Sequence, residues 1–269
     1  MPKKAAAGKG KVAAAKAPVV DEATAALVAR LKKTFADELR GHAAPTDYAS
    51  LTSAVLASDE PPKKLSLLTG CAVEAVGAFF RAVAAVQWTR IEEIALFKID
   101  LGVAGVEALS EAIRSCPKLG ALELIECGLS ARTVAALPNA LLRTPVPPLA
   151  RLRLDGNTQL GAEGCALIMR ALCLMPTTLR ELYASNCGAG EEGAERLALF
   201  VRSRFCRLET LSLDRNAFGE RGMCLLAEAV ARNHSLVTLS LAHNNFTDAL
   251  TVRVRDCFLN VLFATRIVN

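Results

Sequence analysis

The feature that most constrains the fold of this chain is an aliphatic triplet that recurs at regular intervals. Each triplet has aliphatic residues at three positions, numbered here 0, +3 and +5 from the first of them. The six triplets begin at Ile91, Leu119, Leu149, Leu179, Leu208 and Leu236. The intervals between them are 28, 30, 30, 29 and 28 residues, and seventeen of the eighteen positions are Leu or Ile. Such self-similarity predicts a stack of structural repeats.

A second signal follows each triplet at position +8. This position is filled by Ile99, Cys127, Asn157, Cys187, Asn216 and Asn244. Position +10 is usually apolar, and Gly near +14 precedes an apolar stretch with helical spacing. Because side chains alternate along a strand, positions +3 and +5 share one face, which we expect to point inward. A buried Asn or Cys at +8 can bond the backbone of neighbouring turns, where an unpaired polar group would cost about 1–3 kcal/mol.

These residues carry a family resemblance. The unit L-x-x-L-x-L-x-x-(N/C)-x-L, followed by a helix, resembles the leucine-rich repeat, and its period is similar to that of the ribonuclease-inhibitor-like subclass. The match covers residues 91 to about 265 and departs from the pattern at Ile99, which is aliphatic, and at Ala184, which is small. The resemblance implies an α/β fold, a right-handed βα solenoid or horseshoe, with parallel strands on the concave side. Packing physics agrees, since a single repeat cannot bury its apolar face alone.

Three segments are expected along the chain. Residues 1–20 are a Lys/Ala-rich tail that lacks the large apolar residues of a core, and we predict disorder there. Residues 21–90 are predicted to form a helical cap, with helices over 21–41, 46–58 and 72–87 and a possible degenerate first-repeat strand at Leu65-Ser66-Leu67. Residues 91–269 hold the solenoid of six repeats. Its apolar C-terminal end is expected either to be closed by its own last helix or to dock on a partner.

The net charge of +5 belongs to the tail alone. The tail contains five basic residues and no acid: Lys3, Lys4, Lys9, Lys11 and Lys16. The rest of the chain has 27 basic and 27 acidic residues, so the solenoid is not a basic protein. The tail could add a weak, salt-sensitive contact to an acidic partner, for which a tubulin tail and nucleic acid both qualify.

The sequence contains no recognisable motif for catalysis. We found no phosphate-binding loop, no nucleophile elbow and no zinc-protease motif. The nine cysteines form no C-x-x-C pair, which argues against a zinc site and favours reduced thiols in the cytoplasm or nucleus. No apolar run is long enough to cross a membrane. We therefore expect neither an enzyme nor a cofactor, metal or small-molecule substrate.

The informative positions are +2, +4 and +6, which should face outward on the concave sheet. Arg and aromatic anchors with polar neighbours suit protein recognition, whereas a nucleic-acid groove would be dominated by Lys and Arg. The candidate protein-binding residues are Glu93, Phe97, Glu123, Arg151, Arg153, Asp155, Glu181, Tyr183 and Asp214. The alternative is a solvated sheet face whose side chains pair only with one another.

The leading functional prediction is a non-enzymatic scaffold or regulator that binds a protein partner through the concave face. Analogy within the family adds a cytoskeletal or ciliary setting in the cytoplasm, with the nucleus as the alternative. A second hypothesis is regulation of a small GTPase, because Ran GTPase-activating proteins have similar repeats. Those proteins carry an acidic C-terminal region that this chain lacks. A third hypothesis is nucleic-acid binding through the tail.

Overall fold

The fold is described from a computed structural model over residues 29, 63–68, 73–86, 89–142, 146–174, 178–245 and 266–268. The tail, the helix predicted over 46–58 and nearly all of the one predicted over 21–41 lie outside these residues. The continuation of the last repeat beyond residue 245 also lies outside them, except for residues 266–268.

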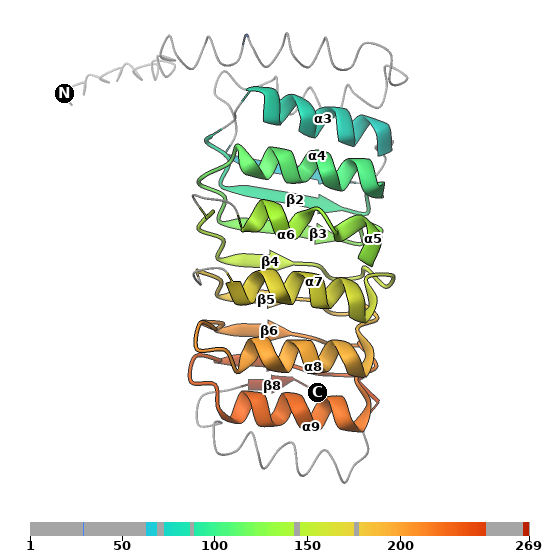
Figure 1. Ribbon diagram of the computed structural model, residues 1–269, viewed down its shortest axis with the longest axis vertical. Helices are drawn as coiled ribbons and strands as arrows, with labels where there is room; N and C mark the ends of the chain where they lie inside the picture. Colours follow the sequence, from blue (N-terminus) through green and yellow to red (C-terminus); the bar gives the residue numbers. More distant parts are fainter. Residues whose placement is uncertain are drawn as a thin grey trace, which may run out of the picture.

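In the described part of the chain, one sheet of eight parallel strands runs through the molecule in sequence order. The strands are β1 Lys64–Leu68, β2 Glu93–Phe97, β3 Ala121–Ile125, β4 Arg151–Arg153, β5 Glu181–Tyr183, β6 Thr210–Ser212, β7 Thr238–Ser240 and β8 Arg266–Val268. Each pairs only with the strands of its neighbouring repeats, and the helices stack in the same order on the other side of the core (Figure 1). The architecture is the α/β solenoid that the repeat predicts.

Helices connect the successive strands. They are α3 Val73–Val86, α4 Gly102–Arg114, α5 Ala131–Val134, α6 Leu137–Leu141, α7 Gly161–Leu174, α8 Gly190–Val201 and α9 Gly219–Ala231. Between β3 and β4 two short helices replace one long helix. Pro138 lies in the first turn of α6, and a proline further inside a helix would remove a backbone hydrogen bond. None of the described helices is long and apolar enough to cross a membrane.

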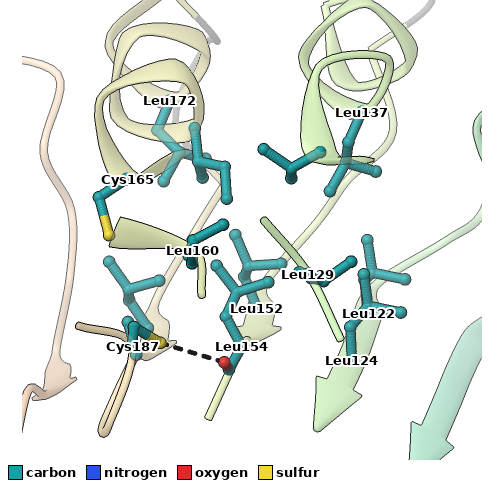
Figure 2. Close-up of a cluster of buried hydrophobic side chains, with 14 of the residues drawn as sticks. Leu122, Leu124, Leu129, Leu137, Leu152, Leu154, Leu160, Cys165, Leu172 and Cys187 are labelled. Carbon is teal, nitrogen blue, oxygen red and sulfur yellow. Dashed lines mark hydrogen bonds between the residues drawn. The ribbon is translucent and has the colours of Figure 1, made fainter. Parts of the chain in front are cut away.

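The aliphatic triplets form the core between strands and helices. Leu122, Leu152, Leu182 and Leu211 occupy position +3 in four successive repeats, and each has no exposed surface. In Figure 2 the leucines of two neighbouring repeats point from their strands toward residues of the facing helices, such as Leu137. The continuity of this core from repeat to repeat is what makes each repeat depend on its neighbours.

Glycine near position +14 lets adjacent helices approach closely. A Cβ atom on Gly222 would lie 2.8 Å from the Cβ atom of Ala194 on the preceding helix. This distance is shorter than two carbon atoms tolerate, so the recurrent glycine has a packing role.

The sheet is longer at both ends than the six triplets indicate. β1 contains the Leu65-Ser66-Leu67 segment and pairs in parallel with β2, so the sheet begins at Lys64 rather than in the repeat that starts at residue 91. At the other end, β8 pairs in parallel with β7, with Thr238 opposite Arg266. No triplet marks β8. Its place is set by the free edge of β7, whose backbone groups need hydrogen-bond partners.

Candidate protein-binding face

The strand ends are held by a ladder of buried side chains at position +8, which we call the Asn–Cys ladder. It comprises Cys127, Asn157, Cys187, Asn216 and Asn244. Asn216 shows how one rung works. Its Oδ1 accepts hydrogen bonds from the backbone N–H of Cys187 at 3.0 Å and of Ala189 at 3.4 Å. Its Nδ2 donates to the carbonyl oxygens of Ala184 at 2.8 Å and Leu213 at 2.9 Å.

The cysteines of the ladder also bond the preceding repeat, but through a thiol, which is a weaker donor than an amide. The thiol of Cys187 donates to the carbonyl oxygen of Leu154 at 3.2 Å, the contact drawn in Figure 2. The thiol of Cys127 donates to the carbonyl oxygen of Leu96 at 3.5 Å. Each rung therefore reaches back to the strand end of the preceding repeat, as the sequence predicts for a buried polar group at this position. The ladder fixes the spacing of the strands that carry the concave face.

The strand register brings two columns of charged side chains together. Ala121, Arg151 and Glu181 lie opposite one another across β3, β4 and β5. Position +4 forms the adjacent column, which contains Glu123, Arg153 and Tyr183. Directly opposed side chains in a sheet are close enough to contact each other.

Six residues on these strands or just after them form what we call the concave network. They are Glu123, Arg151, Arg153, Asp155, Glu181 and Tyr183. Arg151 donates two hydrogen bonds to Glu181, from Nε to Oε2 at 2.6 Å and from Nη2 to Oε1 at 3.3 Å. Its Nη1 also lies 3.8 Å from Oε1 of Glu123, so Arg151 links three strands. Bidentate geometry makes such a pair stronger and more directional than a single contact.

Arg153 holds the second half of the concave network. Its Nη2 donates to Oδ2 of Asp155 at 3.1 Å, and its Nη1 lies 4.0 Å from Oε2 of Glu123. The guanidinium carbon lies 5.0 Å from the centre of the Tyr183 ring, a cation–π distance. The Tyr183 hydroxyl donates to Oε2 of Glu181 at 3.3 Å, which connects the contacts of Arg153 with those of Arg151.

The pairing changes the acid–base behaviour of the concave network. The hydrogen bonds from Arg151 lower the pKa of Glu181 below its ordinary value. The same contact with Glu181 raises the pKa of Arg151. Burial, reinforced by the Glu181 carboxylate, raises the pKa of Tyr183. All three groups therefore keep their usual charge state near neutral pH.

The two arginines are also the more exposed members of their ion pairs. Their side chains are 40% and 37% exposed, whereas the side chain of Glu123 is 15% exposed and that of Asp155 is 20% exposed. The guanidinium groups are therefore more accessible to a partner than the carboxylates of Glu123 and Asp155.

Asp155 and Asp214 have a structural role that the sequence analysis missed. Oδ1 of Asp155 accepts the backbone N–H of Ser185 at 2.8 Å, and Oδ1 of Asp214 accepts that of Ala242 at 2.8 Å. Both aspartates occupy position +6, and each bonds the backbone at position +6 of the next repeat. The recurrence of Asp at position +6 in the sequence could have indicated this bond to the backbone of the next repeat.

Three of the predicted residues lie apart from the concave network: Asp214, which bonds the next repeat, and Glu93 and Phe97 on β2. Glu93 pairs with Lys64 of β1 through an Nζ–Oε1 contact of 2.6 Å, and its neighbour on the other side is Ala121. Phe97 is half-buried at the end of β2, with the Lys98 amine 5.1 Å from its ring centre. The structure thus brings together the residues of β3 to β5 and separates them from those of β2.

The repeats of this chain are similar in sequence to those of several known proteins. No protein-family model matches the chain. It is 30% identical over 158 residues to NACHT, LRR and PYD domains-containing protein 5 of Mus musculus, covering 59% of this chain and 13% of that protein. It is 32% identical over 162 residues to the ribonuclease inhibitor of Sus scrofa, covering 60% of this chain and 34% of the inhibitor.

The chain contains leucine-rich repeats similar to those of these relatives. Tonsoku-like protein of Danio rerio is also similar to the chain, at 32% identity over 57% of this chain and 11% of the relative. The chain therefore spans about a third or less of the length of these three relatives. A solved structure from Bacteroides fragilis shares the fold, with a TM-score of 0.51 and 16% identity over 80% of this chain and 71% of that one.

The buried cysteines of these repeats serve packing and, at position +8, the Asn–Cys ladder. Burial raises the pKa of the Cys127 and Cys165 thiols to about 12, so neither forms a reactive thiolate at neutral pH. Among the residues that the structure describes, no group of three or more His, Cys, Asp or Glu side chains is arranged to hold a metal ion.

Proposed function

We propose that the solenoid is a non-enzymatic protein-binding module and that the concave network is its contact surface. The observation that carries the proposal is the arrangement of Arg151, Arg153 and Tyr183. Their side chains are partly exposed, and their positions are fixed by neighbours within the sheet. Arg and Tyr are frequent anchors of protein interfaces, and a side chain that is already ordered loses less entropy on binding.

The repeat class supports the same proposal. Solenoids present an extended concave surface, and one of the relatives is named for the inhibition of a ribonuclease, which is itself a protein. The partner that fits this surface offers carboxylates or other hydrogen-bond acceptors to the two guanidinium groups. Ser and Thr side chains on β6 and β7 would extend the contact with uncharged hydrogen-bonding groups.

The test compares proteins captured from native cells by three forms of the chain. These are the wild type, the concave variant Arg151→Glu/Arg153→Glu and a matched control, Arg114→Glu/Arg170→Glu, on the exposed side of α4 and α7. Both variants change the net charge equally. We expect the concave variant to lose a set of proteins that the wild type and the control retain. Identical sets for all three forms, with far-ultraviolet circular dichroism confirming that each is folded, would refute the concave-face proposal.

The lysine-rich tail is proposed to add a salt-sensitive contact to an acidic partner, such as a tubulin tail or nucleic acid. The support for the tail contact is the charge distribution, since the five tail lysines account for the whole net charge of +5. A cytoskeletal or ciliary location in the cytoplasm is proposed by analogy with other proteins that contain such repeats. Co-sedimentation with microtubules and binding to labelled DNA should both weaken when residues 1–20 are removed. Binding that is unchanged by the truncation would eliminate the tail as the contact.

A further inference from the structure

A basic pocket lies at the edge of the solenoid, apart from the concave network. It has a volume of about 440 Å³ and is formed by the segments that follow α8 and α9. The cationic residues and the histidine that line it are Arg202, Arg204, Arg207, Arg232 and His234. No acidic residue and no member of the concave network lines it. Four arginines thus line one cavity, although the chain outside the tail contains as many acidic residues as basic ones.

The four arginines of the pocket have no anionic partner within the described residues. The ion pairs found there involve other arginines, for example Arg180 with Glu209 at 3.4 Å and Arg221 with Glu191 at 3.2 Å. Glu209 is the carboxylate closest in sequence to Arg207, and it faces Arg180 instead. The pocket is therefore left with uncompensated positive charge, which favours an anion.

The ends of the adjacent helices do not need these guanidinium groups. At the end of α8, the carbonyl oxygen of Ala198 accepts the backbone N–H of Arg202 at 3.0 Å, and that of Phe200 accepts the N–H of Ser203 at 2.9 Å. The carbonyl oxygen of Val201 accepts Nδ2 of the buried Asn233 at 2.9 Å. These three carbonyl oxygens at the end of α8 accept hydrogen bonds from other groups, so their capping does not account for the arginine side chains.

Contacts within the segment after α8 also order the pocket. Nη1 of Arg207 donates to the carbonyl oxygens of Arg204 at 3.2 Å and Cys206 at 3.3 Å. The guanidinium carbon of Arg204 lies 4.7 Å from the ring centre of the half-exposed Phe205. An arginine has five N–H donors, so these contacts leave donors available to a ligand.

We propose that this pocket binds a phosphorylated segment of a protein partner. A phosphoserine carries close to two negative charges near neutral pH and three acceptor oxygens, so it can engage two or more arginines at once. A single carboxylate would leave most of the guanidinium groups unpaired. The site acts in addition to the concave network and does not depend on it.

A protein ligand fits the charge distribution better than a nucleic acid does. At two preceding strand starts the basic residue is paired with an acid, Arg180 with Glu209 and Lys63 with Glu92, so the basic residues do not form a continuous row along this edge. A nucleic-acid groove needs basic residues that continue along the backbone of the ligand.

The test measures fluorescence anisotropy of a labelled peptide mixture with one fixed phosphoserine and randomised flanking residues. The same mixture with unmodified serine is the first control. The pocket variant is Arg204→Gln/Arg232→Gln, because neither side chain donates a hydrogen bond that holds the fold in the described part of the chain. The matched variant is Arg114→Gln/Lys118→Gln, which removes two positive charges from the corresponding edge near the end of α4.

We expect the wild type and the matched variant to bind the phosphorylated mixture with similar affinity. The pocket variant should bind it at least about tenfold more weakly, because two charge-assisted contacts are lost. The unmodified mixture should not bind. Equal weakening in both variants, equal binding of the unmodified mixture or no binding at all would overturn the proposal. Stronger binding of a labelled single-stranded oligonucleotide that the pocket variant loses, or competition by inorganic phosphate at equal concentration, would overturn the assignment to a protein segment.

Discussion

The Asn–Cys ladder and the concave network both tie neighbouring repeats together with side chains, yet they do so in different surroundings. Asn216 is fully buried and uncharged, and its side chain replaces water for backbone groups of two repeats. Arg151 is 40% exposed and charged, and it pairs with a Glu181 side chain that is 32% exposed. A buried connection is costly to remove because nothing replaces it, whereas water can replace an exposed one. The ladder therefore stabilises the fold, and the network is available for recognition.

The largest effect is expected from removal of a ladder amide. Asn216→Ala leaves the buried N–H groups of Cys187 and Ala189 and the carbonyl oxygen of Ala184 without their side-chain partner. At about 1–3 kcal/mol for each buried group left unsatisfied, we expect a loss of about 3–5 kcal/mol in the free energy of unfolding. Urea unfolding followed by circular dichroism measures it. A loss below about 1 kcal/mol would mean that the ladder does not stabilise the fold.

A smaller loss of stability is expected when the ladder asparagine is replaced by cysteine, the other residue found at position +8. Asn216→Cys copies the residue that occupies the same position one repeat earlier, where Cys187 donates to Leu154. A thiol is a weak donor and acceptor, so part of the connection is kept. We expect a loss of about 1–2 kcal/mol, clearly less than for Asn216→Ala in the same urea series. Equal losses for the two substitutions would show that the cysteine rungs contribute only packing.

The concave network should contribute little to stability. Arg151→Ala removes an exposed bidentate pair, for which we expect a loss of at most about 1 kcal/mol that shrinks further at high salt. Thermal unfolding at low and high ionic strength measures both the loss and its salt dependence. A loss as large as that of Asn216→Ala would contradict the distinction between the two sets of residues.

The smallest effect is the pH dependence of the same pair. Because Arg151 lowers the pKa of Glu181, the carboxylate contributes stability that is present above its ordinary pKa of 4.5 and is lost as the pH falls through the lower, folded-state pKa. We expect the stability difference between the wild type and Glu181→Gln to be a few tenths of a kcal/mol at pH 7, since the pair is exposed. Urea unfolding from pH 7 down to pH 3 should show this difference vanish below pH 4.5. A difference that is constant with pH would mean that ionisation of Glu181 contributes nothing.

The triplets predicted the strands and the face of each side chain because both follow from local periodicity. Leu152 and Leu211 are buried as expected, while Arg151 and Arg153 lie on the opposite face of the sheet. The same periodicity assigned Asn and Cys to buried positions, where hydrogen bonds to neighbouring repeats satisfy them.

The contacts across repeats could not be predicted in the same way. The repeat positions place Arg151 directly opposite Glu181, and only the packed side chains show that Arg151 also reaches Glu123 diagonally, at 3.8 Å. The sequence places Asp155 among the candidate contacts without showing that one of its oxygens binds the backbone of Ser185. Such choices depend on rotamers and strand spacing, which have no counterpart in a linear pattern.

The sequence by itself determined the repeat, its period, the core positions and the neutral balance of charge outside the tail, because these depend on residue type and spacing alone. Only the tertiary structure decided that β8 joins the sheet and which charges pair. It also gathered Arg204 and Arg232 around one pocket. In a solenoid, residues about 30 positions apart become neighbours, so the chemistry of each surface is set by the stacking of repeats.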